Sequence, residues 1–205
     1  MQESSDPVFQ PAVNELAAFQ AISTWRDVDL GSLNGFVGIG GSKEDWSSSG
    51  GRLVCKVPKG ESSFLGIRMK ELSPLVVECE VRWTGDPAEG SGWMGFNQFN
   101  ADKLDTKVNV LARLQDSSPH TLYCLLADDL ALYMDGKLVS RESAFIPTRD
   151  SRDIDFPLAL MTQSQIEISK LRVAHIDKFP GAPPPVPEGT QPPEGQQPTP
   201  EGGHP

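Results

Sequence analysis

Short runs in which hydrophobic and polar residues alternate follow one another along most of the chain, separated by Gly, Pro, Asp and Ser. Alternation with a period of two places hydrophobic side chains on one face of a strand, and turn residues at this spacing are typical of a β-sandwich. Ten strands are predicted, at 52–57, 64–70, 75–83, 93–99, 106–114, 121–126, 130–134, 137–141, 156–161 and 165–176. The pattern therefore predicts an all-β fold of antiparallel strands with little helix.

The clearest alternation is in LVVECEVRW, residues 75–83. The odd positions are all apolar, and the even positions include Glu78, Glu80 and Arg82. We expect the apolar face to lie in the core and the polar face to meet water or a ligand.

Two glutamates two positions apart also raise the question of catalysis. Glu78 and Glu80 would lie roughly 6.5–7 Å apart on one strand face, between the carboxylate separations of retaining and inverting glycosidases. Arg82 continues this face, and a neighbouring cation lowers the pKa of a carboxyl group, which makes it a poor general acid. We therefore favour a solvated or ligand-binding face and assign no catalytic residue. A solvated face predicts that Glu78→Gln and Glu80→Gln leave stability nearly unchanged.

LALYMDGKLVS, residues 130–140, is the strongest local signal. Asp135-Gly136 between two β-rich runs predicts a two-residue hairpin, because both turn positions require positive φ. In this register Leu132 faces Val139 and Tyr133 faces Leu138. Apolar groups on both sides predict strands deep in a two-layer sandwich.

A change of phase marks the last predicted strand, QIEISKLRVAHI. Ile166 and Ile168 lie on one parity, whereas Leu171 and Val173 lie on the other. A bulge near Ser169-Lys170 would bring both pairs into the core. Near the other end of the chain, Ala12–Ile22 has apolar residues at helical spacing and predicts one short helix.

Three regions are predicted from composition. Residues 1–19 form an N-terminal extension with the short helix, and residues 20–178 form the β-sandwich domain. Residues 179–205 are rich in Pro, Gly and Glu, repeat a Pro-Glu-Gly unit and lack apolar anchors, so we expect a disordered linker or tail. Because such linkers join a module to something else, we expect the domain to be part of a larger protein.

The charge balance narrows the classes of partner. The net charge is −10, which disfavours binding to nucleic acid and to anionic membrane surfaces. No apolar run approaches the about 20 residues that span a bilayer, so we expect no membrane insertion. The polar residues QESSDP directly after Met1 resemble the start of a mature secreted chain, which predicts a periplasmic or extracellular location.

The three cysteines, Cys55, Cys79 and Cys124, each lie among apolar residues of a predicted strand. We expect buried free thiols, with a cross-strand Cys55–Cys79 disulfide as the alternative. No cysteine or histidine spacing indicates a structural metal, and no cofactor is predicted. A Ca²⁺ site at Asp128-Asp129 is the alternative to simple solvation of these two acids.

A candidate ligand-binding face combines aromatic, amide and charged side chains. Aromatic rings that stack on sugar rings, beside groups that bind hydroxyls, are what a carbohydrate site requires. In GSGWMGFNQF the alternative is that Trp93, Phe96 and Phe99 are core residues. The candidate ligand-binding residues are Glu78, Glu80, Arg82, Trp93, Asn97, Gln98, Asn109 and Arg113.

Four stretches resemble a known family. WSSSGGRLVCKVPKGESSFLGIRMKELSPLVVECEVRW, GSGWMGF, LALYMDGKLV and DFPLALMTQSQIEISKLRVAHI resemble segments of the 3-keto-disaccharide hydrolase-like domain of the concanavalin A-like lectin/glucanase superfamily. The resemblance implies a two-sheet antiparallel jelly-roll sandwich. The clustered acidic strand motif of the superfamily's glucanases is absent.

Together these observations predict a non-catalytic, lectin-like interaction module that binds glycan or protein within a larger surface or secreted protein. Two alternatives stay open, a glycoside-acting hydrolase that uses Glu78 or Glu80 and a structural spacer domain without a ligand.

Overall fold

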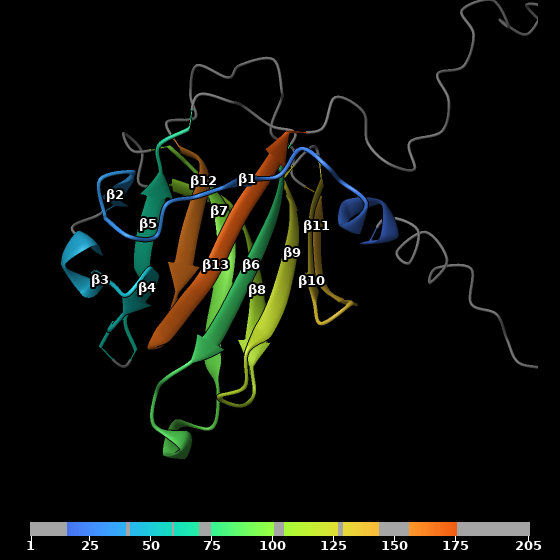
Figure 1. Cartoon of the computed structure of the whole chain (residues 1–205). Coiled ribbons are helices and arrows are strands. Elements are labelled where there is room, and N and C mark those ends of the chain that lie inside the picture. Colours follow the sequence, from blue (N-terminus) through green and yellow to red (C-terminus); the bar gives the residue numbers. More distant parts are fainter. Residues whose placement is uncertain are drawn as a thin grey trace, which may run out of the picture.

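Two antiparallel β-sheets, packed face to face, make up the described part of the chain in the computed structural model (Figure 1). The structure describes residues 16–39, 42–58, 60–69, 75–100, 105–126, 129–143 and 156–175. The predicted tail, residues 179–205, lies outside these ranges.

The larger sheet, called sheet A, follows the order β11 (Lys137–Ser143), β10 (Asp129–Met134), β9 (His120–Leu126), β6 (Leu75–Trp83), β13 (Ile166–His175), β4 (Arg52–Cys55) and β3 (Trp46–Ser49), with β1 (Arg26–Asp27) paired to β13 beside this path. Sheet B follows the order β2 (Phe36–Ile39), β5 (Ser63–Ile67), β12 (Phe156–Thr162), β7 (Gly92–Asn100) and β8 (Asp105–Leu114). Two 3-10 turns are η1 (Ser42–Asp45) and η2 (Pro87–Glu89).

The two-sheet antiparallel jelly-roll sandwich predicted from the sequence is confirmed. All ten predicted strands form, within a few residues of their expected bounds. The short strands β1, β2 and β3 were not predicted, because their sequences lack a sustained alternation.

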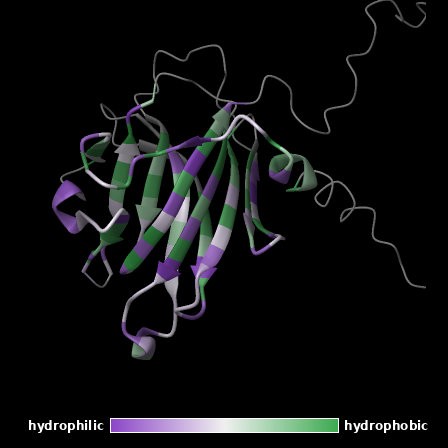
Figure 2. Cartoon of the chain, in the orientation of Figure 1, coloured by the Kyte–Doolittle hydropathy of each residue, from purple (hydrophilic) through white to green (hydrophobic). Residues whose placement is uncertain are grey.

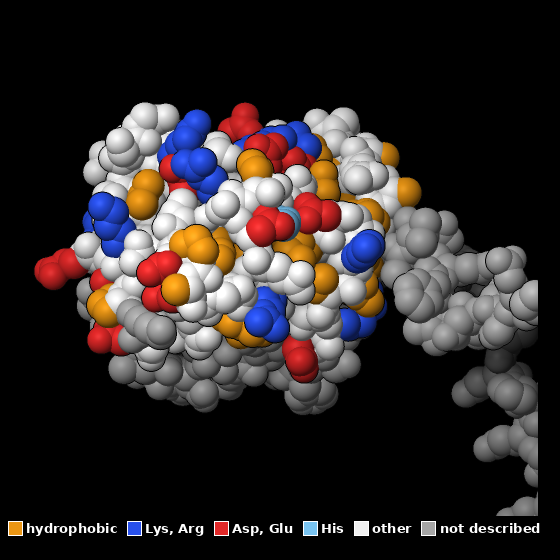
Figure 3. Space-filling model, turned by 90° about the horizontal axis from the view of Figure 1, so that it is seen from below, with side chains coloured by type: hydrophobic (Ala, Val, Ile, Leu, Met, Phe, Trp, Pro, Cys, Tyr) orange, Lys and Arg blue, Asp and Glu red, His pale blue; other side chains and the backbone are white. Residues whose placement is uncertain are grey.

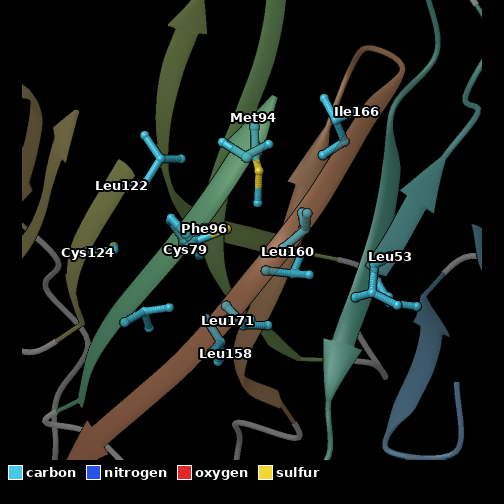
Figure 4. Close-up of a cluster of buried hydrophobic side chains, with 14 of the residues drawn as sticks. Leu53, Cys79, Met94, Phe96, Leu122, Cys124, Leu158, Leu160, Ile166 and Leu171 are labelled. Carbon is cyan, nitrogen blue, oxygen red and sulfur yellow. The ribbon is translucent and has the colours of Figure 1, made fainter. Parts of the chain in front are cut away.

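The core lies between the two sheets, where the inward-facing side chains of both layers interdigitate. Figure 2 shows the alternation of apolar and polar residues along the strands of sheet A. Figure 4 shows part of the core, formed by Leu53, Cys79, Met94, Phe96, Leu122, Cys124, Leu158, Leu160, Ile166 and Leu171. Each fully buried leucine stabilises the fold by about 1.5–3 kcal/mol relative to an exposed one.

The three cysteines are free and buried, as predicted. Cys79 and Cys124 belong to the core between the sheets and act as small apolar residues. Burial raises the pKa of Cys55 to about 11 and raises the pKa of the other two thiols as well. All three are therefore thiols, not thiolates, at neutral pH.

The predicted hairpin forms between β10 and β11. Asp135 has φ 50° and Gly136 has φ 84°, as a two-residue turn of this type requires. The Asp135 carboxylate accepts a hydrogen bond from the Thr121 amide at 2.9 Å and lies 2.7 Å from His120 Nδ1. These contacts stabilise a non-glycine residue in the left-handed region.

The register of this hairpin was predicted only in part. Tyr133 pairs with Leu138 as expected, but Leu132 pairs with Ser140 because a bulge removes Val139 from the register. Leu138 and Val139 are 42% and 41% exposed. The prediction that both strands lie deep in the sandwich is therefore wrong for β11, which is the edge strand of sheet A.

The predicted bulge in β13 is confirmed by a shift of register between Ile168 and Lys170. It brings the isoleucines and Leu171 to the core side. It also places Lys170 opposite Glu80, and Arg172 opposite Glu78, across the pair of strands β13 and β6.

An N-terminal segment covers part of the outer face of sheet A. Residues 16–20 are helical, which confirms the predicted helix in part, since its last two residues, Ala21 and Ile22, are not helical. Phe19 is fully buried and meets the Tyr133 ring edge to face, with 6.1 Å between ring centroids. Val76, Leu125 and Ala131 complete this second apolar cluster. No helix among the described residues has the length and apolar character to cross a membrane.

Candidate functional site

The residues predicted to form one ligand-binding face belong to two different sheets. Glu78, Glu80 and Arg82 lie on β6 in sheet A. The other five predicted residues lie on β7 and β8 in sheet B: Trp93, Asn97, Gln98, Asn109 and Arg113. The hypothesis that one face extends from β6 to β7 and β8 is wrong, because the chain crosses from sheet A to sheet B after Trp83.

Glu78 is not on a solvated face. Its side chain is 3% exposed, and Lys170 Nζ lies 2.7 Å from its Oε1 atom. Arg172 donates to its Oε2 atom from Nε at 2.8 Å and also from Nη2. The Arg172 guanidinium in turn lies over the Trp25 ring, 4.6 Å from its centroid. Glu78 is therefore the buried member of an ion cluster whose Arg172 contacts Trp25 of the N-terminal segment.

This environment sets the charge of Glu78. Burial opposes ionisation, but the hydrogen bonds and positive charges of Lys170 and Arg172 outweigh it and hold the pKa of Glu78 below its ordinary value. A general acid needs a raised pKa to carry its proton at neutral pH. Glu78 is thus unsuited to act as the acid of a catalytic pair with Glu80.

The rest of the β6 row is exposed and paired. The Glu80 side chain is 41% exposed and lies 3.5 Å from Lys170 Nζ. Arg82 Nη2 lies 3.0 Å from Glu167 Oε2, and Arg52 Nη1 lies 2.8 Å from Glu167 Oε1. Exposed pairs of this kind contribute about 0–1 kcal/mol each, and we interpret this row as a cross-strand charge ladder.

Trp93 and Arg113 are brought together on the outer side of sheet B. They are cross-strand partners on β7 and β8, and the Arg113 guanidinium lies 5.9 Å from the centroid of the Trp93 ring. Trp93 is 37% exposed, whereas Phe96 is fully buried in the core. The core interpretation is therefore right for Phe96 and wrong for Trp93.

The amides on the same strands are less accessible than expected. Asn97 pairs in register with Asn109 and is fully buried. Its Oδ1 atom has no hydrogen-bond partner among the described residues, and its Nδ2 atom lies 4.0 Å from Met161 Sδ. The side chains of Gln98 and Asn109 lie outside the described part of the structure.

A depression of about 250 Å³ lies beside Trp93 at one end of the sandwich. Figure 3 shows this end, where acidic and basic side chains are interspersed. Its lining comes from three connections between the sheets, β4–β5, β6–β7 and β12–β13, and from the start of β7. The lining residues are Val57, Gly60, Glu89, Ser91, Trp93, Gln163, Ser164 and Gln165.

Hydrogen bonds tie the connections of the depression together. Ser164 Oγ accepts from the Trp93 amide at 3.1 Å, and the Thr162 hydroxyl donates to the Trp93 carbonyl at 2.8 Å. The Thr84 amide donates to the Gln165 carbonyl at 2.9 Å, which links the β6–β7 connection to the β12–β13 turn. These bonds fix the position of the Trp93 backbone at the depression.

The connection that carries Glu89 is also well supported. Asp86 Oδ1 accepts from the Ala88 amide at 2.9 Å and caps η2. Gly85 and Gly92 press against the buried Trp83 ring, where a Cβ at either position would overlap the indole. This close approach holds the connection against the end of the sheet and keeps Glu89 at the rim of the depression.

Sequence reasoning missed the loop residues of the depression, Glu89, Ser91 and Gln163–Gln165. Three segments distant in the chain supply them together with Gly60, and no local pattern links these segments. The polar stretch TQSQ between two apolar strands was the one available signal.

A second hollow, of about 320 Å³, lies at the opposite end of the sandwich and is lined by Thr24, Arg26, Leu75, Val173 and His175. These described lining residues include no Trp, Tyr or Phe ring. Among the described residues, no group of three or more His, Cys, Asp or Glu side chains is arranged to hold a metal ion. Asp128, one of the two acids considered for Ca²⁺, lies outside those residues.

Comparison with known proteins gives similarities of structure alone. No family model matches the chain, and no curated protein matches it. Its resemblance to the 3-keto-disaccharide hydrolase-like domain therefore stays a prediction.

Three solved structures illustrate the similarity. The Emp46p carbohydrate recognition domain in its metal-free form is 14% identical, with a TM-score of 0.44, over 70% of this chain and 90% of that chain. The carbohydrate-binding module CBM66 from Bacillus subtilis is 13% identical, with a TM-score of 0.47, over 67% and 93%. SCLam, a non-specific endo-β-1,3(4)-glucanase from family GH16, is 13% identical, with a TM-score of 0.46, over 74% and 91%. These similarities concern the fold alone.

Proposed function

We propose that this chain is a non-catalytic carbohydrate-binding module, and that its ligand stacks on Trp93 in the depression between the three connections. The observation that carries the proposal is the exposed Trp93 ring. Among the described residues it is the one aromatic side chain in the set of large exposed hydrophobics. An exposed indole offers an apolar surface to the C–H face of a sugar ring.

The polar lining supplies the other half of a sugar site. The Glu89 carboxylate accepts hydrogen bonds from sugar hydroxyls, and the amides of Gln163 and Gln165 both donate and accept. Few polar groups around an apolar platform are typical of small-ligand sites.

The sequence features support a setting for this module. We propose that residues 20–178 form the binding domain, between an N-terminal extension (1–19) and a Pro-rich linker (179–205), in a larger surface or secreted protein. The Pro, Gly and Glu content of the last segment supports its role as a linker.

Affinity electrophoresis and isothermal titration calorimetry against a panel of soluble polysaccharides and oligosaccharides test the proposal. We expect at least one glycan to bind, and Trp93→Ala to weaken binding by about 30-fold, which corresponds to about 2 kcal/mol for a central aromatic anchor. Leu138→Ala is the matched control, because Leu138 is similarly exposed, at 42%, but lies on the edge hairpin. It should bind like the unmodified chain.

Two results would contradict the proposal. Binding that Trp93→Ala leaves intact would place the ligand elsewhere, and no binding across the panel would favour the spacer or protein-binding alternatives. The release of reducing sugar, lost in Glu80→Gln, would instead establish the hydrolase alternative.

A further inference from the structure

We infer that the depression receives the uncharged end of a glycan chain, and that it does not bind an internal stretch of the chain or an acidic sugar. This inference rests on the proposed function and specifies its ligand. It follows from the position, the size and the charge of the depression.

The depression lies at one end of the sandwich and does not run across the face of a sheet. The β4–β5, β6–β7 and β12–β13 connections each pass from one sheet to the other, and all three contribute residues to the lining of the depression. A groove that binds an internal stretch has to be open at both ends so that the chain can enter and leave. A small depression where three connections converge at the end of the sandwich favours a ligand that ends inside.

The outward-facing positions of β7 beyond Trp93 are closed to a ligand. Along this row Trp93 is followed by Gly95 and then by Asn97, which is fully buried. A chain that continued along β7 past Trp93 would find no open surface at these described positions. The exposed platform thus extends over a single aromatic ring.

The size of the depression also favours a short ligand. Its volume, about 250 Å³, is below the roughly 300–1,000 Å³ of pockets that enclose drug-sized ligands. One or two sugar rings are ligands of the corresponding size. The remainder of a longer chain would extend into solvent and add little to the binding energy.

The charge of the lining selects against acidic sugars. Among the described lining residues, Glu89 is the one ionisable side chain, and none is Lys, Arg or His. The net charge of −10 adds to the unfavourable potential. Arg113 contacts Trp93, but its Nε atom donates to Ser91 Oγ at 2.9 Å and its guanidinium lies over the indole. A carboxylate such as Glu89 can instead accept hydrogen bonds from two neighbouring hydroxyls of a neutral sugar.

The first experiment uses calorimetry to measure the binding of oligosaccharides that are two to six sugar residues long. All of them have the linkage of the glycan that binds in the panel. We expect the Kd per chain to stay constant within about threefold, because the added sugar residues make no further contact with the protein. A threefold change corresponds to about 0.7 kcal/mol. An affinity that rises severalfold with each added residue would show an extended site and overturn the inference, while leaving the proposed function intact. No binding by any glycan would overturn both.

The second experiment compares the neutral glycan with the same chain oxidised at C6 to a uronic acid. We expect binding of the oxidised chain to be at least tenfold weaker. Glu89→Gln should reduce this discrimination to less than about threefold and weaken binding of the neutral chain. Glu80→Gln, which changes the net charge equally on the other sheet, is the control and should preserve the discrimination. Equal binding of both chains by the unmodified protein would overturn the charge argument.

Discussion

Replacement of Glu78 by Gln should destabilise the protein substantially, although the alternating sequence predicts almost no effect. The substitution keeps the size of the side chain and one acceptor oxygen but removes the negative charge. Lys170 and Arg172, which are both part-buried, would then lie close together without their common counter-charge. The ion cluster also orients Arg172 under Trp25, so the loss would loosen the N-terminal segment.

The exposure of the partners sets the magnitude. Removal of one member of a buried ion pair costs about 3–5 kcal/mol because the partner charge is left uncompensated. Here the side chains of Lys170 and Arg172 are 36% and 27% exposed, so water replaces part of the lost interaction. We therefore expect a loss of about 2 kcal/mol, below that range. Glu80→Gln should cost at most about 0.5 kcal/mol, because Glu80 is an exposed partner.

The pH dependence follows from the direction of the pKa shift. The pKa of Glu78 in the folded state lies below its ordinary value of 4.5. The unfolded chain therefore takes up its proton first as the pH falls. The stabilisation is complete above about pH 4.5 and is lost as the pH falls through the folded-state pKa. The difference in stability between the unmodified chain and Glu78→Gln should accordingly shrink on acidification.

Urea unfolding followed by tryptophan fluorescence, at pH 7 and at pH 3, provides the assay. For an m-value of about 2 kcal/mol/M, a loss of about 2 kcal/mol lowers the midpoint by about 1 M urea. Equal midpoints for Glu78→Gln and Glu80→Gln at pH 7 would refute the interpretation of Glu78 as a buried ion-pair centre. A difference from the unmodified chain that is as large at pH 3 as at pH 7 would refute the electrostatic origin of the effect.

Two further predictions concern the hairpin and the cysteines. Gly136→Val should lower the free energy of unfolding by about 1 kcal/mol or more in urea, because Gly136 has φ 84° and a β-branched residue resists this region. A Cβ at this position would meet nothing nearer than Leu16 Cδ2 at 3.7 Å, so a steric clash would not explain the loss. An unchanged midpoint would contradict the backbone explanation. A thiol reagent at pH 8 should label none of Cys55, Cys79 and Cys124 in the native chain and all three in urea without reductant, because burial blocks access and raises their pKa values. A single reactive thiol in urea would indicate a disulfide instead.

Local sequence patterns determined the strands and their turns. The period of two in LVVECEVRW, the Asp135-Gly136 turn and the change of phase at Ser169 each depend on neighbours a few residues apart. Such signals predict strand positions, a hairpin and a bulge, and the structure has all three. Hydrophobic patterning was also sufficient for the two-layer antiparallel fold, because a one-sided apolar strand requires a second layer.

The tertiary structure alone decided what covers each polar face. Alternation shows that Glu78 and Glu80 share a face, but not that one is buried in an ion cluster and the other lies in water. Nor does it show that β6 joins sheet A while β7 joins sheet B, which separates Glu78 from Trp93. Pairing between distant strands depends on the packing of the whole chain. The depression beside Trp93 arises in the same way, because three connections meet there that no local period relates to one another.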